Sequence, residues 1–334
     1  MKRFSRSLCA ALVLTLIASG QVEAQELRIA TLAPGDSQWM RDMIAGGELI
    51  RELTDGRVTL KFRAGGVAGS DAQVLRKIRI GDLHGGAFTA VGLASVYPGL
   101  NTYGIPLIFQ SLGEVDYVRS HLDEKLAARL EKAGFVSLGF SEGGFSNLMS
   151  NIPVTHVDDL RRQKIWVPDN DPISYQVLEA LRLAPVPLEL SDALLGLRRG
   201  LVDVVAAAPV AALVLQWHTE VKYRSDLPLN YSMGVFAITG DAFYDLTESD
   251  QRVVRSVITE VMARIDSASR DDNAEARAIM ARMGIETVPA NRADIENWRQ
   301  IVEAQYPELR RRRDIDVGLF DEMLALLDEY RSTN

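Results

Sequence analysis

An unbroken stretch from Glu248 to Met283 constrains the fold of this chain more than any other feature. It contains neither proline nor glycine over 36 residues, and either residue would weaken or interrupt a helix. The residues Thr247-Glu248-Ser249-Asp250 at its start resemble a capping box, which marks a helix N-terminus. A helix of this length would be about 50 Å long, which exceeds the width of a small domain. We therefore expect this helix to run across two parts of the molecule.

Strand-like and helix-like segments alternate along the chain, first up to residue 140 and again from residue 164. Such alternation is typical of layered α/β architecture with a largely parallel sheet. Because about 310 residues are more than one hydrophobic core usually serves, we expect two domains. The predicted strands are 27–31, 58–63, 87–91, 135–140, one that begins at Lys164, 185–188 and 201–206, and the predicted helices are 38–53, 71–80, 113–132, 172–181 and 191–199.

The first 24 residues have the pattern of a secretory signal peptide. Three basic residues precede an apolar run at 8–18, and Val22-Glu23-Ala24 supplies the small residues that cleavage requires. We expect cleavage after Ala24 and export to the periplasm. The single cysteine of the chain, Cys9, lies inside the apolar run. The mature protein is therefore expected to have no disulfide and no cysteine-based zinc site.

The charge of the predicted mature chain excludes two classes of partner. Removing residues 1–24 removes three cations and one anion, so the net charge becomes 34 − 44 = −10 with neutral histidines. An acidic chain of this kind is unsuited to binding nucleic acid or an anionic membrane surface. The most apolar later segment, 204–215, is 12 residues long and contains Pro209, which is too short for a membrane span. We expect a soluble, exported, two-domain protein.

One motif suggests an exported esterase. Gly139-Phe140-Ser141-Glu142-Gly143 matches G-x-S-x-G after a predicted strand, and His84-Gly85-Gly86 is typical of an esterase oxyanion loop. Asp203 and His218 follow in the chain order of a catalytic triad. A nucleophile elbow, however, needs a helix directly after the serine, and no helix-capping signal follows Ser141. A glycine-rich strand exit is the simpler interpretation, and an esterase that uses Ser141 stays as an alternative.

Metal and cofactor chemistry have no support in the sequence. The four histidines, His84, His121, His156 and His218, include no pair at the i, i+3 or i+4 spacing of metal ligands on a helix. No glycine-rich phosphate loop followed by lysine and serine or threonine is present. We expect neither a metal nor a cofactor.

An ordered set of motifs resembles a known family. The set covers the predicted mature chain and consists of Gly65-Gly66-Val67-Ala68-Gly69-Ser70-Asp71, Leu75-Arg76-Lys77-Ile78-Arg79-Ile80-Gly81-Asp82-Leu83, Ile105-Pro106-Leu107-Ile108-Phe109, Asp159-Leu160, Lys164-Ile165-Trp166-Val167-Pro168, Glu179-Ala180-Leu181, Pro185-Val186-Pro187-Leu188, Leu201-Val202-Asp203 and Lys222-Tyr223. It is similar to the periplasmic substrate-binding subunit of tripartite ATP-independent periplasmic (TRAP) transporters, the DctP-like family.

The resemblance implies a fold and a role. The fold is a two-lobed periplasmic binding protein fold, type II-like, whose lobes are joined by crossing strands and a long helix. We expect lobe I to comprise 25–145 plus 233–272, and lobe II to comprise 146–232 plus 273–334. A small-molecule ligand would be enclosed between the lobes and delivered to membrane permease subunits that use an ion gradient. No reaction would be catalysed.

The sequence departs from the family at three polar positions. In the family pattern K-x-R-V-P, the arginine binds the ligand's carboxylate through paired hydrogen bonds. Here Trp166 occupies that position. A second family arginine falls near Ser146, and a family asparagine corresponds to Ala208. We therefore infer that this chain belongs to a branch that lacks the carboxylate-binding arginine.

These departures predict a predominantly hydrophobic or lipid-like ligand. A buried carboxylate without a partner costs several kcal/mol, whereas burial of each methylene contributes about 0.8 kcal/mol. The resemblance extends to a branch of the family that carries such ligands, in some cases with a TPR-repeat periplasmic protein as a partner. The residues that we expect to contact the ligand are Trp39, Phe88, Thr89, Phe145, Ser146, Trp166, Ala207, Ala208, Trp217 and Met233.

Alternatives to this ligand assignment stay open. Arg63 or Arg182 could enter the site from elsewhere and restore binding of a C4-dicarboxylate or another organic acid. Trp166 could instead pack as a wedge at the hinge, and Trp217 could support the hinge or a partner surface. Phe88 and Phe145 could pack in the hydrophobic core and not contact the ligand.

Overall fold

The computed structural model describes residues 24–334, so nearly all of the predicted signal peptide, residues 1–23, lies outside the described residues. Within the described part, ten strands form one sheet with the central order β2-β1-β3-β9-β4-β7-β5-β6, and β8 joins β4 to β10. The strands are β1 (Gln25–Thr31), β2 (Val58–Arg63), β3 (Gly85–Thr89), β4 (Phe135–Ser150), β5 (Lys164–Pro168), β6 (Ala184–Leu188), β7 (Val204–Ala207), β8 (Tyr223–Ser225), β9 (Asn230–Thr239) and β10 (Glu286–Val288).

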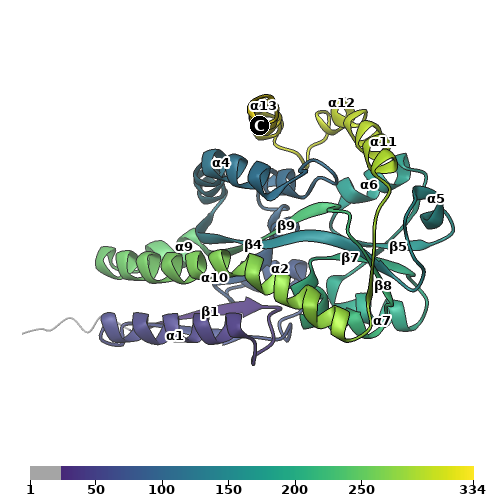
Figure 1. The fold of residues 1–334 in the computed structure, drawn as a ribbon. Helices are drawn as coiled ribbons and strands as arrows, with labels where there is room; N and C mark the ends of the chain where they lie inside the picture. The colour runs from purple at the N-terminus through teal and green to yellow at the C-terminus, as the bar shows by residue number, and fades with distance from the viewer. Residues whose placement is uncertain (1–23) are drawn as a thin grey trace, which may run out of the picture.

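Helices cover both faces of the sheet (Figure 1). The α-helices are α1 (Gln38–Leu53), α2 (Asp71–Arg79), α3 (Ala90–Leu93), α4 (Leu112–Lys132), α5 (Val157–Leu160), α6 (Pro172–Ala180), α7 (Ala193–Arg198), α8 (Pro209–Val214), α9 (Gly240–Tyr244), α10 (Glu248–Arg282), α11 (Arg292–Glu303), α12 (Tyr306–Leu309) and α13 (Val317–Thr333). Short 3-10 helices are η1 (Pro98–Gly104), η2 (Leu190–Asp192) and η3 (Trp217–Thr219).

The long strand β4 belongs to both halves of the sheet. From Phe135 to Ser146 it pairs with β9, and from Asn147 to Ser150 it pairs with β7. The pairing with β9 shifts register near Gly139 and again near Gly144, and both glycines have positive φ, 148° and 95°. The predicted strand at 135–140 was therefore too short. Its glycines do not end the strand but introduce the bulges that let it continue.

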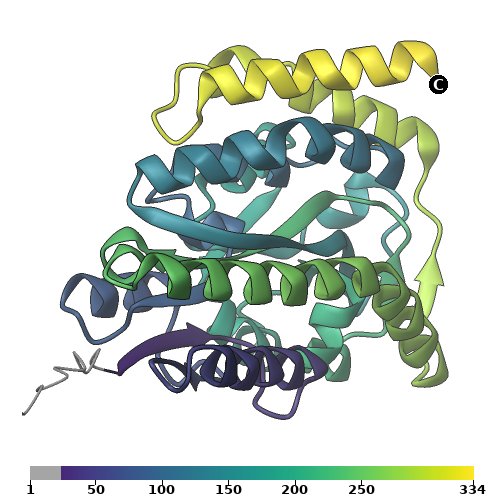
Figure 2. The same ribbon diagram turned by 90° about the vertical axis from the view of Figure 1, so that its left-hand side faces the viewer.

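The long helix α10 confirms the prediction from the uninterrupted stretch. The side chain of Thr247 caps its first turn by accepting a hydrogen bond from the Asp250 backbone N–H. Near its start, α10 packs Val254 and Ile258 into a core with β1 and β4, and near its end it packs Met280 into a second core. Figure 2 shows α10 crossing most of the width of the molecule. One helix thus supports both halves of the sheet.

The C-terminal helix α13 packs against α4. Phe320, Met323 and Leu327 are fully buried in the same core as Leu122 and Leu126. In both views, α13 lies beside α4 on the side of the sheet away from α10 (Figures 1 and 2). The predicted assignment of 273–334 to the second lobe did not anticipate this packing, and the predicted lobe boundaries stay a prediction.

Asn273 of α10 connects the two halves through hydrogen bonds. Its Nδ2 donates to the carbonyl of Gly143 in β4 at 3.0 Å, and its Oδ1 accepts from the N–H of Val210 at the start of α8 at 3.1 Å. Asn273 is only 5% exposed, and both hydrogen bonds are at least partly buried. Loss of the amide would leave the two backbone groups without this partner in a place with restricted access to water.

We expect Asn273→Ala to lower the free energy of unfolding by about 2–3 kcal/mol, because it leaves buried backbone groups unpaired. The measurement is urea denaturation followed by circular dichroism. Asn297→Ala is the matched control, since Asn297 is an exposed residue inside α11 and gains the same helix propensity. Equal stability of the two variants would contradict the structural role of Asn273.

Candidate functional site

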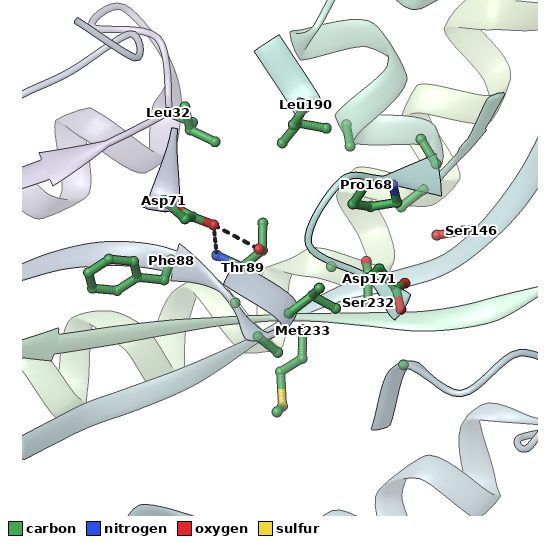
Figure 3. Close-up of a pocket in the computed structure, with 18 of the residues that line it drawn as sticks. Leu32, Asp71, Phe88, Thr89, Ser146, Pro168, Asp171, Leu190, Ser232 and Met233 are labelled. Carbon is green, nitrogen blue, oxygen red and sulfur yellow. Dashed lines mark hydrogen bonds between the residues drawn. The ribbon is translucent and has the colours of Figure 1, made fainter. Parts of the chain in front are cut away.

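A cavity of about 440 Å³ lies between the two halves of the sheet. One wall comes from the β1–α1 loop, the start of α2 and the end of β3, and the other comes from β5, β7 and the start of α6. Met233 of β9 lies at its floor (Figure 3). Leu32 and Leu190 face each other from opposite walls in the same view. The cavity is therefore bounded by elements far apart in the sequence, and β4 and β9 bring them together.

Trp166 of β5 forms part of the second wall. Ile165 and Val167 point into one core, whereas Trp166 points to the opposite face and packs in another, because successive side chains alternate along a strand. The indole lies edge-on to Trp217 with ring centroids 4.9 Å apart, and its Nε1 donates to the carbonyl of Leu188 at 3.1 Å. Only 6% of Trp166 is exposed. Trp166 is thus mainly a core residue that also borders the cavity.

The positions predicted to have lost polar anchors do line the cavity. Ser146, Ala207 and Ala208 are all buried and border it. Within residues 24–334, the side chains around the cavity include no lysine, arginine or histidine. Arg63 is bound by Asp82 through two hydrogen bonds of 2.8 Å and does not border the cavity. Arg182 is exposed and does not border it either.

Most of the other predicted contact residues also border the cavity. Trp39, Phe88, Thr89, Trp217 and Met233 do so, although Phe88 and Trp217 are almost entirely buried and serve mainly as core.

The prediction for Phe145 was wrong, because Phe145 does not border the cavity. Since β4 continues past residue 140, Phe145 points to the opposite face from Ser146. There it packs edge-on against Tyr231 at 5.9 Å.

Two buried aspartates at the cavity were missed by the sequence predictions of contact residues. Asp71, at the start of α2, accepts hydrogen bonds at its Oδ2 from the Thr89 hydroxyl at 2.9 Å and the Thr89 N–H at 3.3 Å (Figure 3). Burial raises its pKa from 3.8 to about 6. Asp171 caps α6 by accepting from the Ser174 N–H at 2.9 Å, and burial raises its pKa as well.

The structure does not assemble the predicted esterase. Ser141 lies inside β4, opposite Gly234 of β9, and the strand runs on to Ser150 with no helix after the serine. His218 bonds through Nδ1 to the carbonyl of Ala212 at 3.2 Å. The G-x-S-x-G pattern is therefore part of a bulged strand, and a nucleophile elbow is not formed.

The described part of the chain has neither a cluster of metal ligands nor a helix suited to a membrane. Among residues 24–334, no group of three or more His, Cys, Asp or Glu side chains is placed to hold a metal ion. In the same range, no helix has both the length and the apolar character that crossing a membrane requires.

Comparison with known proteins gives a consistent family. The family model described as bacterial extracellular solute-binding protein, family 7 (DctP) matches residues 29–312. A solute-binding protein of Roseobacter denitrificans is 28% identical over 202 residues, which cover 59% of this chain and 62% of the relative. The match thus spans about three fifths of that relative's length.

Solved structures share the fold at lower identity. The sugar acid binding protein DctPAm of Advenella mimigardefordensis, in complex with galactonate, has a TM-score of 0.84 and 19% identity, covering 92% of this chain and 99% of that one. A TRAP periplasmic solute-binding protein of Haemophilus influenzae with bound L-gulonate has a TM-score of 0.82 and 16% identity, covering 91% and 99%. At these identities the likeness concerns the fold.

We expect Asp71 to make stability depend on pH. Because its folded pKa of about 6 lies above the ordinary 3.8, its neutral form favours the fold. Its contribution is full below pH 4 and is lost as the pH rises through 6. Asp71→Asn should remove this dependence, so that the variant gains up to about 3 kcal/mol relative to the parent protein between pH 4 and pH 7.5.

The measurement is urea denaturation of both proteins at pH 4, 5.5 and 7.5. Asp245→Asn is the matched control, since Asp245 is exposed beside α9 and the charge change is the same. Parallel stability curves for the parent and Asp71→Asn would show that Asp71 does not titrate as the buried geometry requires.

Proposed function

The chain belongs to family 7 of the bacterial extracellular solute-binding proteins, the DctP family of TRAP solute-binding proteins, and from this premise we propose that it delivers a small molecule to a TRAP membrane permease. Its fold is the predicted two-lobed α/β fold of periplasmic binding proteins. Proteins of this family are periplasmic and bind solutes without transforming them, which sets the esterase alternative aside. The cavity between the halves of the sheet is the proposed place of capture.

The lining of the cavity supports a predominantly hydrophobic or lipid-like ligand. Its walls are mainly aliphatic, aromatic and alanine side chains, and no basic side chain from residues 24–334 borders it. A carboxylate enclosed there would lose its hydration without gaining a cationic partner, at a cost of several kcal/mol. An apolar chain would gain about 0.8 kcal/mol for each methylene that it buries. This absence of a cation is the observation that carries the proposal.

An organic acid is the second candidate, because the solved relatives favour it. The proteins from Advenella and Haemophilus are described with galactonate and L-gulonate, and a relative from Rhodobacter capsulatus is named a C4-dicarboxylate-binding protein. None of these relatives points to a TPR-repeat partner, and the proposed function does not require one.

Mass spectrometry of the compounds that co-purify with the protein from a periplasmic extract distinguishes the two candidates. Under the proposal, denaturation releases a fatty, isoprenoid or other lipid-like compound at close to one per protein. A sugar acid or dicarboxylate at that occupancy would favour the second candidate and would overturn the hydrophobic assignment.

We expect Ala206→Phe to weaken binding of the neutral fluorescent probe N-phenyl-1-naphthylamine at least tenfold. Ala206 is a half-buried residue of β7 at the cavity, so a phenyl group there would fill space that the probe needs. The measurement is a fluorescence titration. Ala128→Phe on the exposed face of α4 is the matched control and should bind like the parent protein. Unchanged affinity in Ala206→Phe would place the probe elsewhere.

A further inference from the structure

Asp71 is held in one orientation at the cavity wall. The Thr89 hydroxyl donates its only proton to Oδ2 of Asp71 and accepts from the N–H of Gly92, so the contact leaves no freedom to the hydroxyl. A Cβ atom at Gly92 would lie 1.7 Å from the same carboxylate oxygen. Position 92 therefore needs glycine to make room for the carboxylate. The fold accommodates a buried acid here through two specific residues.

The carboxylate of Asp71 keeps an unused acceptor. Both hydrogen bonds from Thr89 reach Oδ2, and Oδ1 accepts none from residues 24–334. Asp71 forms no ion pair with any described residue either, although it is 91% buried. Oδ1 is not one of the fully buried side-chain atoms without a partner, so it keeps some access to water, and a ligand that supplies a donor would take the place of that water. The open acceptor borders the cavity.

The opposite wall adds negative charge. Asp171 and Asp169 border the cavity from the β5–α6 connection, and Asp171 is 6% exposed. Figure 3 shows Asp71 and Asp171 on opposite sides of the cavity. Neither Asp169 nor Asp171 has an ion-pair partner among the described residues. Arg312 lies near enough to Asp171 for the aspartate to raise the pKa of the guanidinium, but Arg312 does not border the cavity. The acids that do border it disfavour an anion and favour a cation or a hydrogen-bond donor.

We propose that the cavity selects an amphiphile with a primary ammonium head and an apolar chain, and that Oδ1 of Asp71 receives the head. This inference rests on the proposed function, because it names the head group of the hydrophobic ligand. The ammonium supplies the donors that Asp71 lacks, and the chain covers the apolar remainder of the lining. A carboxylate head on the same alkyl chain would find no cationic side chain in the lining and would face the carboxylate of Asp71.

The test compares an ammonium and a carboxylate head group on the same decyl chain. Decylamine and decanoate, both below their micellar concentrations, compete at pH 7.5 with N-phenyl-1-naphthylamine bound to the unaltered protein. We expect decylamine to displace the probe at a concentration at least tenfold lower than decanoate does. Equal potency, or stronger displacement by decanoate, overturns the inference. Because this comparison uses the unaltered protein, it does not depend on whether a variant folds.

Variants then assign the preference to one residue. Asp71→Asn should reduce the preference for decylamine over decanoate, measured as the ratio of the two displacing concentrations on the same variant, to less than threefold. Asp245→Asn should keep the full preference. A preference that persists in Asp71→Asn overturns the role of Asp71. Binding of galactonate without binding of the probe or either decyl compound would instead overturn the proposed hydrophobic function, so the two failures are distinct.

Discussion

The close approach of β4 to α10 is the constraint on which the rest of the structure depends. At Gly139, a Cβ atom would lie 2.5 Å from the Cβ of Met262, and at Gly144 it would lie 2.8 Å from the Nδ2 of Asn273. A larger residue at either position would push strand and helix apart, and both positions also have positive φ. Because both cores rest on α10, that displacement would change the separation of the two cavity walls. The separation of the cavity walls thus depends on the close approach of the β4 backbone to α10.

Charged side chains, including one from α4, also stabilise the contact between β4 and α10. Arg119 donates to Asp266 of α10 at 2.9 Å, and Asp266 in turn accepts from the backbone N–H of Glu142 in β4. Arg270 bonds to the Glu142 carboxylate, which is almost fully buried. Arg119 also donates to the hydroxyl of Tyr231 at 3.3 Å, and Tyr231 borders the cavity. The network therefore ties the orientation of α10 to the floor of the site, and its partial removal would leave buried charge unpaired.

The sequence predicted features that depend on neighbouring residues, such as helix ends, and missed features that depend on contacts between distant residues. The absence of proline and glycine, together with the Thr247 cap, placed α10 within one residue of its observed end at Arg282. Trp166 and its aliphatic neighbours lie on opposite faces of β5, which follows from the alternation of side chains along any strand. Glycines in β4 were interpreted as a strand end because their tertiary reason, the contact with α10, is invisible in the sequence. Phe145 was misplaced for the same reason. Asp71 was missed because its partner Thr89 is 18 residues away and meets it only in the fold.

Under the proposed function, the packing around Trp166 adds to the effect of the missing cation. The indole is fixed by Trp217 and by the Leu188 carbonyl, and it fills the core of the second half of the sheet. An arginine there would lose that packing and would bring its charge into an apolar core before it reached the cavity. Replacing Trp166 by arginine would therefore also remove the packing partner of Trp217. The nearby acids act in the same direction, since Asp71 and Asp171 would repel the anion that an arginine attracts.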